Sequence, residues 1–299
     1  MGAWSAMRAQ AAVERTVTLP DGRRVAVREG GDLDGVPVLF HHGTPASRHQ
    51  AGLVEAAARR HGIRLISVNR PGYGAAADTP PSLASVGADT VEVARAVGVE
   101  EFATAGVSGG GPYALATALA GPRRVTKVAV VAGIGPWRLI QPAVPGDPER
   151  DLLTLTDGGQ TEAALTGFRA LAAADHRGLL AIEDDEALID AYLDGVPPAD
   201  LAWLDRERKL SWAADLREAV ARFDGYARDN VAWGGAWDID VTAIACPVRL
   251  YYGDQDRLVP PSHGRWLAGR IPGATLTALT GAGHGTASFA YWDEVFPAL

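Results

Sequence analysis

Six short, almost entirely apolar runs, separated by longer stretches with helical periodicity, constrain the fold of this chain more than any other feature. Strands of a parallel sheet are buried on both faces and read as continuous apolar runs, whereas their connecting helices carry apolar residues at three- and four-residue spacing. The alternation predicts an α/β fold. The runs are residues 38–41, 64–68, 102–107, 125–132, 248–252 and 274–279.

Two further strands are expected near the N-terminus. Residues 16–19 and 24–27 flank the turn Pro20-Asp21-Gly22, a pattern that indicates a hairpin. We therefore expect a mostly parallel eight-stranded sheet flanked by helices. The helices between the strands are expected at residues 47–61, 82–97, 112–119, 263–271 and 287–299.

Residues 135–242 interrupt the alternation, because no convincing strand occurs there. Helical patterns occur instead at 162–174, 186–193 and 213–223. Acidic residues outnumber basic ones by 21 to 10 between positions 137 and 242, and five of the eight tryptophans lie there. We expect a core formed by residues 1–134 and 243–299, with 135–242 inserted into it as a helical unit.

Composition excludes several classes of function. The net charge is −8, and no cluster of basic residues suits a nucleic-acid partner. The single cysteine, Cys246, rules out an internal disulfide and a thiolate metal site. No signal peptide and no apolar stretch of membrane-spanning length are found, so we expect a soluble, cytoplasmic protein without a membrane partner. The oligomeric state is left open, a homodimer included.

The strongest local motif is Gly106-Val107-Ser108-Gly109-Gly110, between an apolar strand and a helical run. A sharp strand-to-helix turn forces its central residue to positive φ, and side chains two positions away on either side would clash. Such a turn exposes the Ser108 hydroxyl as a nucleophile. It also directs the Gly109 N–H and the following helix N-terminus towards a developing oxyanion.

A serine nucleophile needs a base and an acid that orients the base. His284 lies among glycines after the last strand, where the loop is free to reach a serine. Asp254 and Asp256 follow the strand at 248–252, and we favour Asp256 because it leads into the next helix. A tight turn after the run at 38–41 would present the Thr44 N–H as a second oxyanion donor. The adjacent His41 and His42 lack a third ligand, so no metal is expected.

Five motifs follow one another along the chain: His42-Gly43-Thr44-Pro45, Arg70-Pro71-Gly72-Tyr73-Gly74, Gly106-x-Ser108-x-Gly110, Gly253-Asp254-Gln255-Asp256-Arg257-Leu258-Val259-Pro260 and Gly283-His284. In this order they resemble the α/β-hydrolase superfamily over nearly the whole chain. The resemblance implies a helical cap at residues 135–242, an oxyanion hole at Thr44 and Gly109, and a role for Asp256 in the triad. A serine at the nucleophile position disfavours the dehalogenase and epoxide hydrolase activities of the superfamily, which use aspartate. The loop at residues 69–75 begins with Asn69 and ends with Ala75, whereas many members of the superfamily have an aspartate and a serine at these two positions.

The expected activity is cleavage of an ester or related acyl bond of a small, mostly apolar substrate through an acyl-enzyme, with no cofactor. His42, Trp137, Trp212 and Trp233 are candidate substrate-binding residues, although cap tryptophans also serve to pack a small core. Three alternatives remain: a carbon–carbon bond hydrolase, a non-hydrolytic enzyme of the same fold, and a ligand-binding protein without turnover. Dinucleotide binding is disfavoured: residues 72–77 and 109–114 each match a glycine fingerprint, but the strand at 125–132 does not end in the acidic residue that would bind a ribose.

Overall fold

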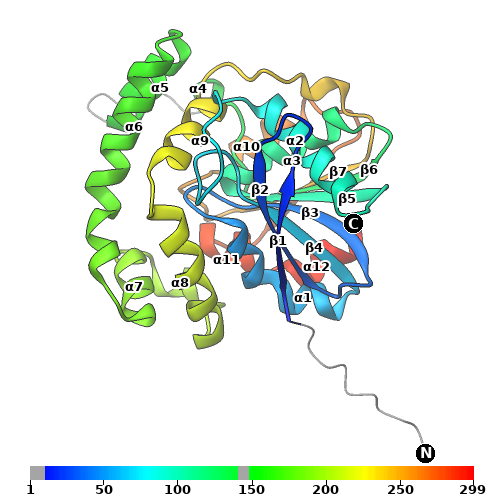
Figure 1. The fold of residues 1–299 in the computed structure, drawn as a ribbon, viewed down its shortest axis with the longest axis horizontal. Helices are drawn as coiled ribbons and strands as arrows, with labels where there is room; N and C mark the ends of the chain where they lie inside the picture. The colour runs from blue at the N-terminus through cyan, green and yellow to red at the C-terminus, as the bar shows by residue number, and fades with distance from the viewer. Residues whose placement is uncertain (1–10, 141–147) are drawn as a thin grey trace, which may run out of the picture.

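The computed structural model describes residues 11–140 and 148–299, with the side chain of Arg138 left out, and contains one eight-stranded sheet (Figure 1). The first ten residues of the expected core and residues 141–147 of the expected insertion lie outside the described residues. The strand order is β1-β2-β4-β3-β5-β6-β7-β8, with β1 and β2 antiparallel to their neighbours and the rest parallel. The strands are β1 Val13–Thr18, β2 Arg24–Gly31, β3 Val36–His41, β4 Ile63–Val68, β5 Phe102–Val107, β6 Val125–Val131, β7 Val248–Gly253 and β8 Thr275–Leu279.

Helices cover both faces of the sheet, because successive strand residues point to opposite sides. Leu39 packs with α2, α3 and α10, whereas its neighbours Val38 and Phe40 pack with α1, α11 and α12. This arrangement confirms the predicted α/β fold class with a mostly parallel, two-sided sheet. The helices outside the insertion are α1 Glu55–Arg60, α2 Leu83–Ala96, α3 Gly111–Ala120, α10 Ser262–Ala268, α11 His284–Phe289 and α12 Trp292–Val295.

Between β6 and β7 the described chain is helical and lies along one side of the sheet (Figure 1). Its buried residues join both core clusters of the sheet, Trp233 on one face and Trp212 on the other. The division into two domains therefore stays a prediction. The helices are α4 Trp137–Ile140, α5 Pro148–Asp157, α6 Thr161–His176, α7 Asp185–Tyr192, α8 Arg206–Val220 and α9 Asp224–Gly234.

Two predicted helices differ from the structure. The stretch 47–61 begins as a 3₁₀ helix at Arg48–Val54 before α1, and Gly52 within it has low α-helix propensity. The stretch 287–299 is divided into α11, α12 and a final 3₁₀ turn. No helix in the described part of the chain is long and apolar enough to cross a membrane.

Candidate active site

Ser108 occupies the sharp turn between β5 and α3, with a φ of +51°. A side chain at Gly106 would meet the Gly110 carbonyl, and one at Gly110 would meet the His41 carbonyl. The glycines are therefore required by close backbone contacts, as the motif predicts. The turn leaves Ser108 partly exposed at the carboxyl edge of the parallel strands, where open α/β sheets bind ligands.

The structure brings Ser108, His284 and Asp256 together. The Ser108 Oγ lies 3.1 Å from His284 Nε2, and His284 Nδ1 lies 2.7 Å from Asp256 Oδ2. Because a carboxylate can only accept a hydrogen bond, His284 Nδ1 must carry the ring proton. The other nitrogen, Nε2, is then left to accept the serine proton. The imidazole is 21% exposed, whereas the carboxylate is fully buried, so the base is open to a substrate and its orienting group is not.

Backbone donors distinguish the two candidate aspartates. The second oxygen of Asp256 accepts hydrogen bonds from the N–H groups of Leu258 and Val259, at 2.9 and 2.8 Å. These bonds fix the carboxylate towards His284. Asp254 accepts a hydrogen bond from the Gly281 N–H at 2.8 Å instead and so stabilises the loop before the histidine.

Thr44 and Gly109 lie side by side next to Ser108. A Cβ on Gly109 would come within 2.9 Å of the Thr44 Cβ and 3.4 Å of the Thr44 nitrogen. A Cβ on Gly43 would be 3.6 Å from the Ser108 Cβ. The Thr44 N–H has no hydrogen-bond acceptor among residues 11–140 and 148–299. Its role as an oxyanion donor stays a prediction.

The four predicted substrate-binding residues are mostly buried. His42 has no exposed surface, and burial together with the nearby Arg70 charge holds its pKa well below the usual range. Trp212 and Trp233 are 7% and 4% exposed, while Trp137 is half-buried with its ring centroid 6.1 Å from that of Trp233. The indole N–H groups of Trp137 and Trp233 have no acceptor within the described ranges. Roles in substrate binding stay predictions for all four.

Two aspartates of the insertion contact the loops around Ser108, and sequence reasoning missed both. Asp200 accepts hydrogen bonds from the N–H groups of Gly285 and Thr286, at 3.0 and 2.8 Å, directly after His284. Asp229 forms a buried ion pair with Arg70, with 2.5 Å between Nη2 and Oδ2. Neither aspartate lies in a motif, so only three-dimensional proximity identifies them.

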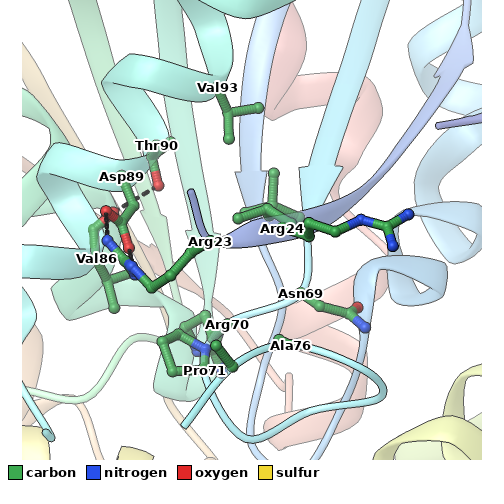
Figure 2. Close-up of a pocket in the computed structure, with 13 residues that line it drawn as sticks. Arg23, Arg24, Asn69, Arg70, Pro71, Ala76, Val86, Asp89, Thr90 and Val93 are labelled. Carbon is green, nitrogen blue, oxygen red and sulfur yellow. Dashed lines mark hydrogen bonds and ion pairs between the residues drawn. The ribbon is translucent and has the colours of Figure 1, made fainter. Parts of the chain in front are cut away.

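A small pocket next to the Arg70 loop lies apart from Ser108. It lies between β2 and α2, where Arg23 pairs with Asp89 at 2.6 Å (Figure 2). Its volume of about 20 Å³ suits a water molecule. The described residues that line it include none of the three residues gathered at Ser108.

Comparison with known protein families matches residues 38–298 to the alpha/beta hydrolase family. The chain belongs to this family. The match spans the sheet from β3 onwards, the insertion and all three residues gathered at Ser108.

The relatives of this chain carry names that indicate different activities. A protein of Caulobacter sp. (strain K31) named as a carbamate hydrolase is 29% identical over 86% of this chain and 91% of its own length. A non-heme chloroperoxidase of Streptomyces lividans is 28% identical over 91% of this chain and 94% of its own. The solved structure of an esterase from Exiguobacterium antarcticum superposes with a TM-score of 0.64 at 20% identity and covers 96% of both chains, which shows the shared fold.

Proposed function

We propose that the chain is a serine hydrolase that cleaves a carboxylic ester or related acyl bond of a small, mostly apolar substrate through an acyl-enzyme. The observation that carries the proposal is the continuous hydrogen-bonded line from Ser108 through His284 to Asp256, at 3.1 and 2.7 Å. A nucleophile, a base and an orienting acid in this geometry suit acyl transfer.

In the acylation step, the Ser108 oxygen attacks the substrate carbonyl carbon while its proton passes to His284 Nε2. The carbonyl oxygen becomes an oxyanion and is stabilised by the N–H groups of Thr44 and Gly109. Collapse of this intermediate breaks the bond to the leaving group, which takes the proton from His284. Asp256 stays ionised and stabilises the imidazolium.

Deacylation uses the same groups with water as the nucleophile. His284 removes a proton from water, the resulting hydroxide attacks the acyl carbon, and the Ser108 oxygen leaves with that proton. The products are a carboxylic acid and the alcohol or other leaving group. No cofactor is needed for either half of this reaction.

We further propose that residues 135–242 act as a helical cap over the site. Its Trp203 supplies aromatic surface beside the base: the Trp203 ring lies 4.8 Å from that of Phe289 on α11, and a Cβ on Gly285 would be 3.3 Å from the Trp203 nitrogen. Such surface favours an uncharged acyl or alcohol group.

A fluorophosphonate probe tests the proposal, because it phosphonylates only an activated serine. We expect stoichiometric labelling of the wild-type protein and none of Ser108→Ala. Ser67→Ala provides a matched control, since Ser67 is fully buried in β4, has no side-chain hydrogen bond among the described residues and should leave labelling unchanged. Labelling that persists in Ser108→Ala would refute the assignment.

The bond class is tested separately. A series of p-nitrophenyl esters of increasing chain length should be hydrolysed to equimolar acid and p-nitrophenol. A protein that is labelled at Ser108 but releases no acid from esters would favour the carbon–carbon or non-hydrolytic alternatives. A protein that binds these esters without either reaction would favour the ligand-binding alternative.

A further inference from the structure

The loop after β4 carries a fully buried arginine that pairs with a residue of the insertion. Arg70 is 1% exposed, and its partner Asp229 on α9 is 1% exposed. The Nε and Nη2 atoms of Arg70 donate to the two carboxylate oxygens at 2.9 and 2.5 Å. Burial lowers the pKa of Arg70, but Asp229 outweighs burial and the net pKa is raised, so the guanidinium stays charged.

The remaining donors of Arg70 hold the loop that carries Thr44. Nη1 donates to the His42 carbonyl at 2.6 Å, and Nη2 donates to the Gly43 carbonyl at 2.7 Å. The Gly43 carbonyl and the Thr44 N–H belong to one planar peptide group. A guanidinium on the carbonyl oxygen therefore fixes the direction of this N–H and, by polarising the peptide, strengthens it as a donor.

Thr44 is also held through its side chain. Its Oγ1 donates to Asp229 Oδ2 at 2.7 Å. The threonine is thereby fixed at both its peptide group and its hydroxyl, next to Gly109. The carboxylate that anchors the arginine is the same one that anchors the expected oxyanion donor.

Two phenols complete the surroundings of Asp229. The hydroxyls of Tyr73 and Tyr113 donate to it at 2.8 and 2.7 Å. Burial and the carboxylate raise the pKa of both phenols well above the usual value, so both remain protonated donors. Asp229 thus has a full set of donors, which compensates for the burial of a charge.

We propose that Arg70 is a positioning residue for the oxyanion hole and that Asp229 holds it there, which makes the insertion a fixed part of the catalytic apparatus. The inference rests on the proposed serine hydrolase function. It assigns a role to the arginine of a loop whose sequence departs from the family pattern, and to an insertion residue outside every motif.

Arg70→Lys tests this role, because an ammonium group keeps the charge but cannot bond two carbonyls and a carboxylate in the same planar geometry. We expect kcat per active site for a p-nitrophenyl ester to fall about 10- to 100-fold. KM should change less than twofold. Affinity for a trifluoromethyl ketone, which forms an oxyanion on Ser108, should fall in parallel with kcat. If the lysine variant does not fold, Thr44→Val serves as the second test. It removes the bond to Asp229 but keeps the N–H, and it should lower kcat in the same way.

Glu29→Gln is the matched control. Glu29 is likewise buried, at 2% exposed, and pairs with Arg64 at 2.5 Å, but it lies on β2 away from these contacts. This substitution should lower the melting temperature. It should leave kcat within twofold of wild type, when kcat is divided by the active fraction titrated with fluorophosphonate. Unchanged kcat in Arg70→Lys and Thr44→Val, or an equal loss in Glu29→Gln, would overturn the inference. An unlabelled, inactive wild type would instead refute the proposed function.

Discussion

Replacing Gly109 with alanine places a methyl group against Thr44. The new Cβ would meet the Thr44 hydroxyl and lie 2.9 Å from its Cβ, whereas carbon atoms pack at about 3.5–4.0 Å. Thr44 must therefore retreat by roughly 0.6–1 Å. Rotating its side chain does not suffice, because the hydroxyl is bonded to Asp229 at 2.7 Å and the peptide to Arg70.

The shift displaces an expected oxyanion donor while Ser108 keeps its base. A donor misplaced by about 1 Å costs roughly 100-fold in rate, close to the loss expected from deleting one. We predict that kcat/KM of Gly109→Ala falls about 100-fold, mostly in kcat. Initial rates on p-nitrophenyl acetate, divided by the active fraction titrated with fluorophosphonate, measure this loss.

Gly178→Ala is the matched control for a glycine-to-alanine change that meets no neighbour. Gly178 lies in a 3₁₀ turn of the insertion, its φ is not positive, and nothing lies within 4 Å of an added Cβ. Its rate should stay within twofold of wild type. A folded Gly109→Ala protein with more than a third of wild-type kcat/KM would show that Thr44 and Gly109 do not form the oxyanion hole.

Three other variants probe one aspartate at the site and two in the insertion. Asp256→Asn should lower kcat about 10⁴-fold by favouring the wrong tautomer of His284, and steady-state rates that stay within tenfold of wild type would contradict this. Asp200→Ala removes the acceptor of two N–H groups beside His284 and should reduce kcat roughly fivefold, about 1 kcal/mol; an unchanged kcat would exclude a positioning role. Burial raises the pKa of Asp215 to about 7, so the folded protein holds a proton that the unfolded chain loses above pH 4. Urea denaturation measures the free energy of unfolding of wild type minus that of Asp215→Asn. This difference should fall between pH 4 and 7 and stay flat above pH 8, and a difference that rises with pH would contradict the raised pKa.

The sheet was predictable because its central parallel strands, β3 to β7, are buried on both sides. Each apolar run was long enough to be found and fell within one or two residues of an observed strand, as with residues 102–107 and β5. The insertion was harder to predict. Helices α5 and α9 were not expected, and α9 begins and ends near Gly225 and Gly234, which have low helix propensity.

The residues of the candidate site also differ in how far the sequence predicts them. Ser108 and His284 lie in glycine-rich turns whose geometry leaves a local signature in the sequence. Asp229 has none, because its importance comes from contacts with Arg70 and Thr44, far away along the chain. A buried ion pair between residues so far apart in the sequence can be identified only from the three-dimensional structure.

Trapping the acyl-enzyme tests the central claim most directly. Acid quenching of a p-nitrophenyl ester reaction during its first turnover, followed by mass spectrometry of the digested protein, locates the acyl group. We predict one acyl group, on the peptide that contains Ser108, and none in Ser108→Ala. An adduct on another residue, or p-nitrophenol release by Ser108→Ala at the wild-type rate, would contradict the account.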